Sequence, residues 1–259
     1  MKDAPEFLYR YYRFDEYTET IFVNNEIYFQ KPSKFNDPLD SKIAYARGLT
    51  LEEEQDFLKR NLPLVIPGLT EQDINKMSKD PLKVEQFFND FCEKQDKRRD
   101  ELGVYCLTTL KDNILMWAHY SDCHKGFCLE FDARDEFFRK QALPITYSRE
   151  LPIRNIWERT VGDFQKNRER NAELLLTKAE DWKYENEWRI VYTPKQGGPG
   201  IHTFPEELLT GVILGFRISN ENRNSIIEWC KNRAFKPNIY QAKPKDREFG
   251  LDIVPLESY

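Results

Sequence analysis

The stretch NILMWAHYSDCHKGFCLEF, residues 113–131, decides the fold class because it holds a helix, a loop and a strand in immediate succession. Residues 113–120 predict a helix that carries Met116 and Trp117, and residues 126–131 predict an apolar strand. Strands and helices also mix along the rest of the chain, without the regular alternation of a doubly wound parallel sheet. The sequence therefore predicts an α+β protein with a mixed, largely antiparallel sheet core.

Composition places the chain among ordinary globular proteins. It has 259 residues, of which 40% are hydrophobic and 14% aromatic, enough for a sizeable core. The formal net charge of −5 gives no global attraction to nucleic acid or to anionic lipid. No secretory signal opens the sequence, and no apolar run approaches the ~18 residues of a membrane-spanning helix. We therefore expect a cytoplasmic protein with five free cysteines and no membrane partner.

Residues 50–101 differ from the rest of the chain because their sequence pattern is almost entirely helical. Phe87, Phe88, Phe91 and Cys92 recur at helical spacing, which indicates a buried stripe. We interpret this block as a helical insertion within a single domain that spans residues 1–259. The segment KPSKFNDP, residues 31–38, precedes it; its two prolines and its Asn-Asp pair predict a shaped loop.

The densest group of polar and aromatic side chains is MWAHYSDCHKG, residues 116–126, which includes two of the three histidines. Helix–loop–strand junctions hold side chains on a rigid frame while exposing them. One interpretation is a ligand pocket in which aromatic rings supply flat faces, a histidine supplies a donor and a lysine binds phosphate. The residues concerned are Trp117, His119, Tyr120, His124 and Lys125.

Three alternatives stay open for the same stretch. A metal site would use His119, Cys123, His124 and Cys128, with His119 and Cys123 at i, i+4 on a continued helix, but no second cluster completes a recognised set. A nucleophilic cysteine would be Cys123 or Cys128, although adjacent residues rarely orient a productive Cys–His pair. The third alternative is purely structural: a buried histidine and a solvated lysine.

A second stretch, WKYENEWRIVY at residues 182–192, carries paired carboxylates. If residues 184–192 are extended, Glu185, Glu187 and Arg189 share one face, and Tyr184 and Trp188 share the other. Two carboxylates roughly 7 Å apart along a strand make one of them a candidate acid or orienting base. The structural alternative is a solvent-facing strand on which Arg189 pairs with a Glu.

Arg10 lies among tyrosines in the first predicted strand, residues 7–12. A buried guanidinium needs a partner. Arg10 could hold a phosphate or carboxylate of a ligand together with Asn36 and Asp37 of the shaped loop, or it could pair with Asp37 or a Glu for structural reasons.

A set of motifs resembles one family across most of residues 7–192, apart from the helical insertion. The resemblance is to a bacterial domain-of-unknown-function family, family 2971, which has relatives among abortive-infection proteins of phage defence. The family name carries no established reaction, so the resemblance narrows the class and leaves the mechanism open. The motifs are Tyr9-Arg10-Tyr11, Ile27-Tyr28-Phe29, Phe35-Asn36-Asp37-Pro38, Met116-Trp117-Ala118-His119-Tyr120, His124-Lys125-Gly126, Glu130-Phe131-Asp132, Lys178, Trp182 and Glu185-x-Glu187-x-Arg189.

The opening strand–helix–strand order also looks like that of ADP-ribosyltransferases, and Glu185-x-Glu187 looks like their acidic pair. By that resemblance Arg10 would bind NAD, Glu187 would be catalytic and Glu185 would orient the acceptor. Cleavage of a nicotinamide–ribose bond builds oxocarbenium character, which a fixed carboxylate stabilises. The middle-strand Ser or Tyr of that family has no clear counterpart in this sequence.

Three functions follow as hypotheses. The first is an ADP-ribosyltransferase-like or NAD-cleaving enzyme, a phage-defence effector with NAD as its substrate and no metal. The second is a non-catalytic ligand-binding or sensor module. The third is a metal-dependent nuclease or other phosphodiester enzyme. A small-molecule nucleotide is the expected ligand of the first, and the acceptor and the oligomeric state stay open. The metal ligands of the third would be Asp37, Glu130, Asp132, Glu185 and Glu187.

Overall fold

The computed structural model describes residues 5–46, 50–65, 68–155 and 175–256. The chain divides into two compact units, each with a core of its own. The first is formed by Met1–Lys31, Leu102–Ile145 and Asp181–Tyr259, and the second by Pro32–Glu101 and Thr146–Glu180. The predicted helical insertion, residues 50–101, falls wholly within the second unit. Folding of the two units as one cooperative domain stays a prediction.

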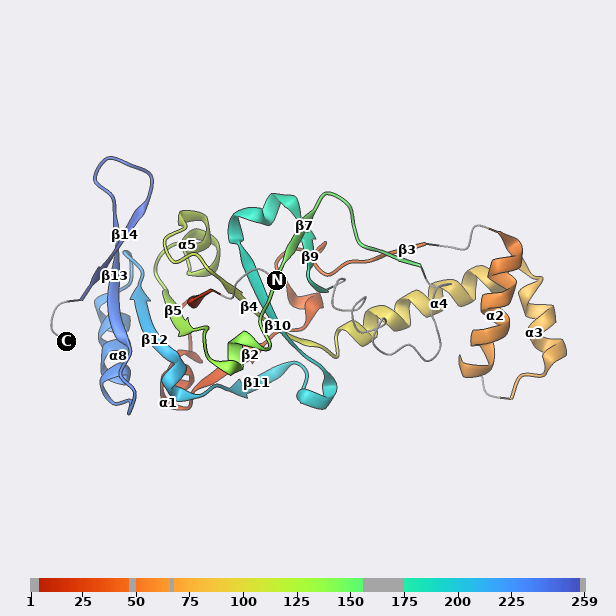
Figure 1. Cartoon of the computed structure of the whole chain (residues 1–259), viewed down its shortest axis with the longest axis horizontal. Helices are drawn as coiled ribbons and strands as arrows, with labels where there is room; N and C mark the ends of the chain where they lie inside the picture. The colour runs from red at the N-terminus through yellow and green to blue at the C-terminus, as the bar shows by residue number, and fades with distance from the viewer. Residues whose placement is uncertain (1–4, 47–49, 66–67, 156–174, 257–259) are drawn as a thin grey trace. The chain divides into compact units, whose positions relative to one another are not determined.

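The first unit is built on an eight-stranded sheet (Figure 1). Every neighbouring pair in it is antiparallel except β12 and β13, which are parallel. This mixed, mostly antiparallel sheet with its flanking helices confirms the predicted α+β class. In spatial order the strands are β14 (Leu251–Pro255), β13 (Asn238–Pro244), β12 (Leu209–Leu214), β5 (Phe127–Asp132), β1 (Phe7–Tyr12), β4 (Gly103–Thr108), β10 (Glu187–Tyr192) and β6 (Leu143–Pro144).

Shorter elements complete this unit. Strands β2 (Glu26–Phe29) and β11 (Gly200–Thr203) pair in a small sheet of their own. The α-helices are α1 (Thr18–Val23), α5 (Ile114–Tyr120), α6 (Glu136–Arg139) and α8 (Asn220–Lys231), and the 3-10 helices are η3 (Glu180–Glu185), η4 (Pro194–Gln196) and η5 (Glu206–Leu208).

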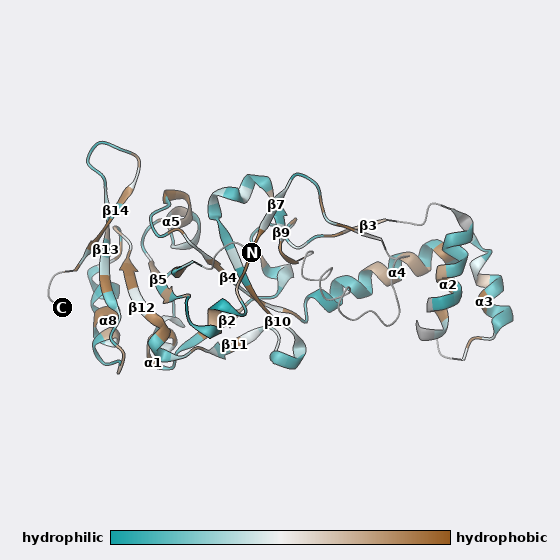
Figure 2. Ribbon diagram, in the orientation of Figure 1, coloured by the Kyte–Doolittle hydropathy of each residue, from teal (hydrophilic) through white to brown (hydrophobic). Residues whose placement is uncertain are grey.

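Side chains alternate between the two faces of the large sheet, and each face has its own apolar cluster. The larger cluster includes Leu8, Leu129 and Ile190, and α1 and α8 cover it with Phe22 and Ile226. In Figure 2 most of β12 is coloured as hydrophobic, as expected for a strand in this core. The second cluster lies on the opposite face beneath α5, and its strand residues alternate along the sequence with those of the first cluster. It includes Tyr9, Tyr11, Trp117, Cys128 and Ile213.

Strand β12, helix α8 and strand β13 form a crossover that ends in the one parallel strand pair of the large sheet. Helix α8 begins after Ser219, whose side-chain oxygen accepts a hydrogen bond from the backbone N–H of Asn222. Such an N-cap satisfies one of the free N–H groups at a helix start. The carboxyl ends of the two parallel strands therefore lie at the same edge as the start of α8.

The second unit contains the three predicted helices, α2 (Leu51–Val65), α3 (Glu71–Ser78) and α4 (Pro81–Arg99), and the 3-10 helix η1 (Pro32–Lys34). Their core is formed by Phe57, Leu58, Leu62, Ile74, Phe87 and Phe91, which confirms the predicted apolar stripe of α4. Figure 2 shows the charged carboxyl end of α4 as hydrophilic. Two small parallel sheets pair β3 (Ala44–Ala46) with β8 (Ile153–Asn155) and β7 (Thr146–Ser148) with β9 (Thr177–Ala179).

Within the ranges given above, no helix combines the length and apolarity needed to span a bilayer.

Candidate functional site

The segment that precedes β10 is not extended as predicted. Residues up to Glu185 form the 3-10 helix η3, and Asn186 has a φ of 44° before β10 begins at Glu187. Three side-chain hydrogen bonds fix this bend to the connection between β4 and α5. They run from Thr108 Oγ1 to the Glu185 carbonyl, from Asn186 Nδ2 to Thr109 Oγ1, and from Asn113 Nδ2 to the Tyr184 carbonyl. A further hydrogen bond, from Tyr120 to Glu185, joins the two sequence segments singled out above, residues 116–126 and 182–192.

The bend changes which side chains share a face. Tyr184, predicted to lie with Trp188 on the core face, instead packs against the cluster beneath α5. Trp188 does face the larger cluster, as predicted, and so does Ile190. The predicted spacing of Glu185 and Glu187 along one extended strand is accordingly wrong, because a positive-φ residue lies between them.

Both carboxylates are buried and hydrogen-bonded. Glu185 is 2% exposed, and its Oε1 accepts a hydrogen bond of 2.5 Å from the Tyr120 hydroxyl of α5. Glu187 is 5% exposed and receives two bonds from the guanidinium of Arg189, 2.7 Å from Nε and 3.1 Å from Nη2. Paired charge-assisted bonds of this kind fix geometry strongly. The pairing of Arg189 with a Glu was foreseen as the structural alternative, but the site is buried instead of facing solvent.

Glu187 begins a row of four polar side chains on the face beneath α5, one on each of the strands β10, β4, β1 and β5, and the row ends at a glycine of β12. The strand registers align Glu187 with Thr108, Thr108 with Tyr9, Tyr9 with Glu130, and Glu130 with Gly211. Tyr9 Oη donates to Glu130 Oε2 over 3.0 Å. Burial, together with the nearby Glu130, raises the pKa of Tyr9, so its hydroxyl stays a donor. Buried polar side chains therefore extend across the sheet from Glu187.

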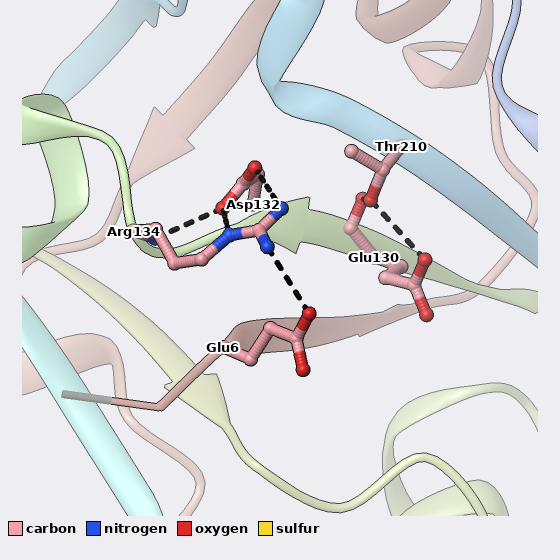
Figure 3. Close-up of polar contacts among 5 residues, drawn as sticks. All are labelled: Glu6, Glu130, Asp132, Arg134 and Thr210. Carbon is pink, nitrogen blue, oxygen red and sulfur yellow. Dashed lines mark hydrogen bonds and ion pairs between the residues drawn. The ribbon is translucent and has the colours of Figure 1, made fainter. Parts of the chain in front are cut away.

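The carboxylates predicted as metal ligands bind other partners. Glu130 Oε1 accepts a bond from Thr210 over 3.1 Å, whereas Asp132 holds the guanidinium of Arg134 over 2.7 Å, and Arg134 also reaches Glu6 (Figure 3). In the portions of the chain that the structure describes, no three His, Cys, Asp or Glu side chains are grouped for metal binding. The nuclease hypothesis stays a prediction.

The predicted ligand-binding side chains of α5 and of the turn after it differ in burial. Trp117 is completely buried, donates from Nε1 to the Lys111 carbonyl over 3.0 Å, and has no exposed face for a ligand. His119 is exposed beside Tyr120, and Lys125 is exposed and pairs with Asp122 over 3.4 Å. Of the predicted ligand-binding side chains in this stretch, Tyr120 is thus the one that contacts the carboxylate pair.

Helix α5 ends at Tyr120, as predicted, and does not continue through Cys123, as the metal-site alternative required. Asp122, Cys123 and His124 have φ values of 47°, 52° and 68°, which form a left-handed turn. The i, i+4 relation of His119 and Cys123 on one helix is therefore wrong. The turn directs the ring of His124 between Trp117 and Phe216, with ring centroids 6.1 Å and 4.7 Å away.

The cysteines differ in their fitness as nucleophiles. Burial raises the pKa of Cys128 well above its usual value, with Glu130 adding to the effect, so this thiol stays protonated. Burial, and after it the nearby Glu187, raises the pKa of Cys106 to about 12. A protonated thiol is a weak nucleophile and a poor metal ligand. Cys123 is exposed.

The structure places Arg10 on the other face of the large sheet from Glu187, and it places the shaped loop in the second unit. Arg10 projects from the opposite face of the sheet, with its guanidinium 5.6 Å and 5.3 Å from the rings of Tyr12 and Tyr105, and it donates to the Cys106 carbonyl over 2.7 Å. Asn36 and Asp37 belong to the second unit. Asp37 there accepts a bond from the backbone N–H of Leu39, which confirms a shaped loop.

The sequence interpretation missed Thr108, Tyr9 and Thr210 as members of the site region. Tyr9 and Thr108 each lie in a predicted strand, in which side chains alternate between the two faces. Their common face could have been inferred if the pairing of the two strands had been known. The pairing itself depends on contacts between residues about 99 positions apart, and no local pattern encodes it.

The comparisons agree with the family resemblance. Residues 116–190 match the model of a family described as "Protein of unknown function (DUF2971)". No curated protein and no solved structure matches the chain. The matched residues begin within α5 and end within β10, so they include Tyr120, Glu185, Glu187 and Arg189. The part of the chain that carries the candidate site is thus similar to the DUF2971 family of proteins of unknown function.

Proposed function

We propose that the first unit is an ADP-ribosyltransferase-like or NAD-cleaving enzyme with Glu187 as its catalytic carboxylate and Glu185 as the group that orients the acceptor. The observation that carries this proposal is the pair of buried carboxylates fixed at the start of β10 by Tyr120 and Arg189. The role in phage defence rests on the family resemblance alone. NAD is the proposed substrate, and the acceptor is water or a hydroxyl, thiol or amine of another molecule.

The chemistry requires negative charge at a fixed place. As the bond between nicotinamide and ribose lengthens, positive charge develops on the ribose ring, and a preorganised carboxylate lowers the energy of that state. The acceptor then forms its bond to the ribose carbon and loses a proton, while neutral nicotinamide leaves with the electron pair of the broken bond. Glu185 would accept the acceptor's hydrogen bond in this step.

Arg189 has a defined part in this arrangement. A carboxylate buried without a partner tends to take up a proton, and an adjacent guanidinium favours its ionised form. Two carboxylates and one guanidinium carry a formal charge of −1, which suits the cationic nicotinamide ring of NAD. Arg189 is therefore a positioning residue in this proposal, and the location of Arg10 on the opposite face does not support the NAD-binding role expected of it.

The test is the release of nicotinamide from NAD by the purified chain, followed chromatographically with and without a cell lysate as a source of acceptors. Wild type is compared with Glu187→Gln. The matched control is Glu206→Gln, because Glu206 also lies against a buried arginine, 3.8 Å from Arg233 Nε, but in η5, directly before β12, which is four strands from β10. Release by wild type and the control, with loss in Glu187→Gln, is the expected result. No release under either condition would exclude NAD cleavage.

A second candidate is a non-catalytic ligand-binding or sensor module. The observation in its favour is that Glu187 and Glu185 already bind Arg189 and Tyr120, which is the arrangement of a structural polar network. In that case NAD or another nucleotide would raise the melting temperature without any product being formed.

A further inference from the structure

A groove of about 320 Å³ lies at the carboxyl ends of the parallel strands β12 and β13, beside the start of α8. Its volume falls in the range of small-molecule sites. Open sheets with parallel strands bind ligands in the crevice outside the carboxyl ends of those strands. Gln241 closes the floor by donating from Nε2 to the carbonyls of Leu214 and Gly215, over 3.1 Å and 3.0 Å.

The lining of the groove is cationic. Arg223, in the first turn of α8, and Lys243, at the end of β13, both line it, and no acidic side chain does. The nearest acids in sequence and register are Glu221 in α8 and Asp252 opposite Lys243 in β14. Within the described ranges, neither Arg223 nor Lys243 forms an ion pair with these or any other acids.

The start of α8 adds to the attraction for an anion. This helix is 12 residues long, and its backbone dipoles leave a partial positive charge at the end that faces the groove. Phosphate groups bind where such an end is accompanied by cationic side chains. The two cations and the helix start therefore favour one or two phosphate groups.

The other end of the groove is aromatic. Phe216 lines it and is 40% exposed, in the turn between β12 and α8. The ring of His124 lies 4.7 Å from the Phe216 ring and supports it from the side of α5. An exposed aromatic face held in place is a surface on which a nucleobase stacks.

We propose that this groove binds a nucleotide, with its phosphates at Arg223, Lys243 and the start of α8 and its base against Phe216. The groove is distant from Glu185 and Glu187 of the proposed NAD-cleaving site. Four strand spacings, roughly 19 Å, separate β12 from β10, and the registers align Glu187 with Gly211, three residues before Leu214 at the carboxyl end of β12. The groove is thus a second site, and its occupancy does not depend on the proposed function.

Calorimetric titration with ADP tests this proposal, with adenosine and inorganic phosphate as separate probes. We expect Arg223→Gln and Lys243→Gln each to weaken ADP binding about tenfold or more, because each removes a charged contact to phosphate. Phe216→Ala should weaken it roughly 5- to 150-fold through the loss of stacking. The matched control is Lys231→Gln, which removes an exposed cation at the other end of α8 and should leave binding unchanged.

Glu187→Gln separates this site from the proposed catalytic one, because it should abolish nicotinamide release and leave ADP binding intact. The proposal is overturned if ADP does not bind, if neither charge-removing variant weakens it, or if Glu187→Gln abolishes it. Adenosine binding as tightly as ADP would show that the phosphates make no contact. Phosphate binding as tightly as ADP, with no effect of Phe216→Ala, would reduce the groove to a simple anion site and exclude the nucleotide.

Discussion

Glu187 and Arg189 stand two residues apart on β10, and burial makes each dependent on the other. Removal of one partner from a buried ion pair leaves a desolvated charge, which typically costs about 3–5 kcal/mol. We therefore expect Arg189→Met to lower the free energy of unfolding by about that amount, measured by urea denaturation. The double variant Glu187→Met, Arg189→Met should recover most of the loss, because no charge is left unpaired. Equal losses in single and double variants would mean that the pair is not coupled.

His124 makes stability depend on pH near neutrality. Burial, and to a smaller extent Arg217, lowers the pKa of His124 from its ordinary value of 6.5. The unfolded chain therefore takes up a proton near pH 6.5, and the folded chain takes it up only at lower pH. Stability should fall as the pH drops from 7 through 6.5, by at most about 1.4 kcal/mol per pH unit for this group, until the folded pKa is reached.

The measurement compares the free energy of unfolding of wild type and His124→Gln at several pH values between 5 and 7.5. We expect the difference between the two proteins to shift in favour of the variant as the pH falls. A constant difference across this range would contradict the lowered pKa.

At the scale of elements, the turn between α5 and β5 depends on a glycine. A Cβ built at Gly126 would lie 1.9 Å from the Tyr12 carbonyl oxygen, a backbone atom that cannot move without shifting β1. We expect Gly126→Ala to lower the free energy of unfolding by about 3 kcal/mol or more, measured by thermal or urea denaturation. Gly250→Ala is the control, since its Cβ would meet only the flexible side chain of Lys245 at 3.2 Å. Similar small effects in both variants would contradict the close approach at Gly126.

Helices and strands that follow from a local sequence pattern were predictable. Features that depend on contacts with residues far away in the sequence were not. Helix α4 was predicted because a proline follows an N-cap aspartate and phenylalanines recur along one face. Strand β10 was predicted over most of its length because of its β-branched and aromatic residues. The bend before it was missed, because Asn186 takes a positive φ held by Thr109, 77 residues away.

The candidate site shows the same division. The sequence identified Glu185, Glu187, Arg189 and Tyr120, since carboxylates, an arginine and an aromatic are conspicuous in short stretches. It could not show that Tyr120 and Glu185, 65 residues apart, form a hydrogen bond. Arg10 was placed with them by resemblance, but side-chain alternation along β1 turns it to the opposite face of the sheet.

At the scale of the whole molecule, the two units have separate apolar cores. Phe91 is 8% exposed and packs against Phe57 at a ring-centroid distance of 5.6 Å in the second unit. Phe91→Ala should therefore weaken α2, α3 and α4 by about 3–5 kcal/mol. Hydrogen exchange should rise in these helices and stay unchanged in β5 and β12 of the first unit. Equal acceleration in both units would show that they unfold together, as one cooperative domain.

The measurement that tests the central claim most directly is nicotinamide release from NAD by the full chain, with Glu187→Gln and Glu206→Gln assayed in parallel and their folding verified by melting temperature. The proposed function predicts release by wild type and by Glu206→Gln, and its loss in folded Glu187→Gln. If folded Glu187→Gln releases nicotinamide as fast as wild type, the carboxylate pair at the start of β10 is a structural network, and catalysis by Glu187 is excluded.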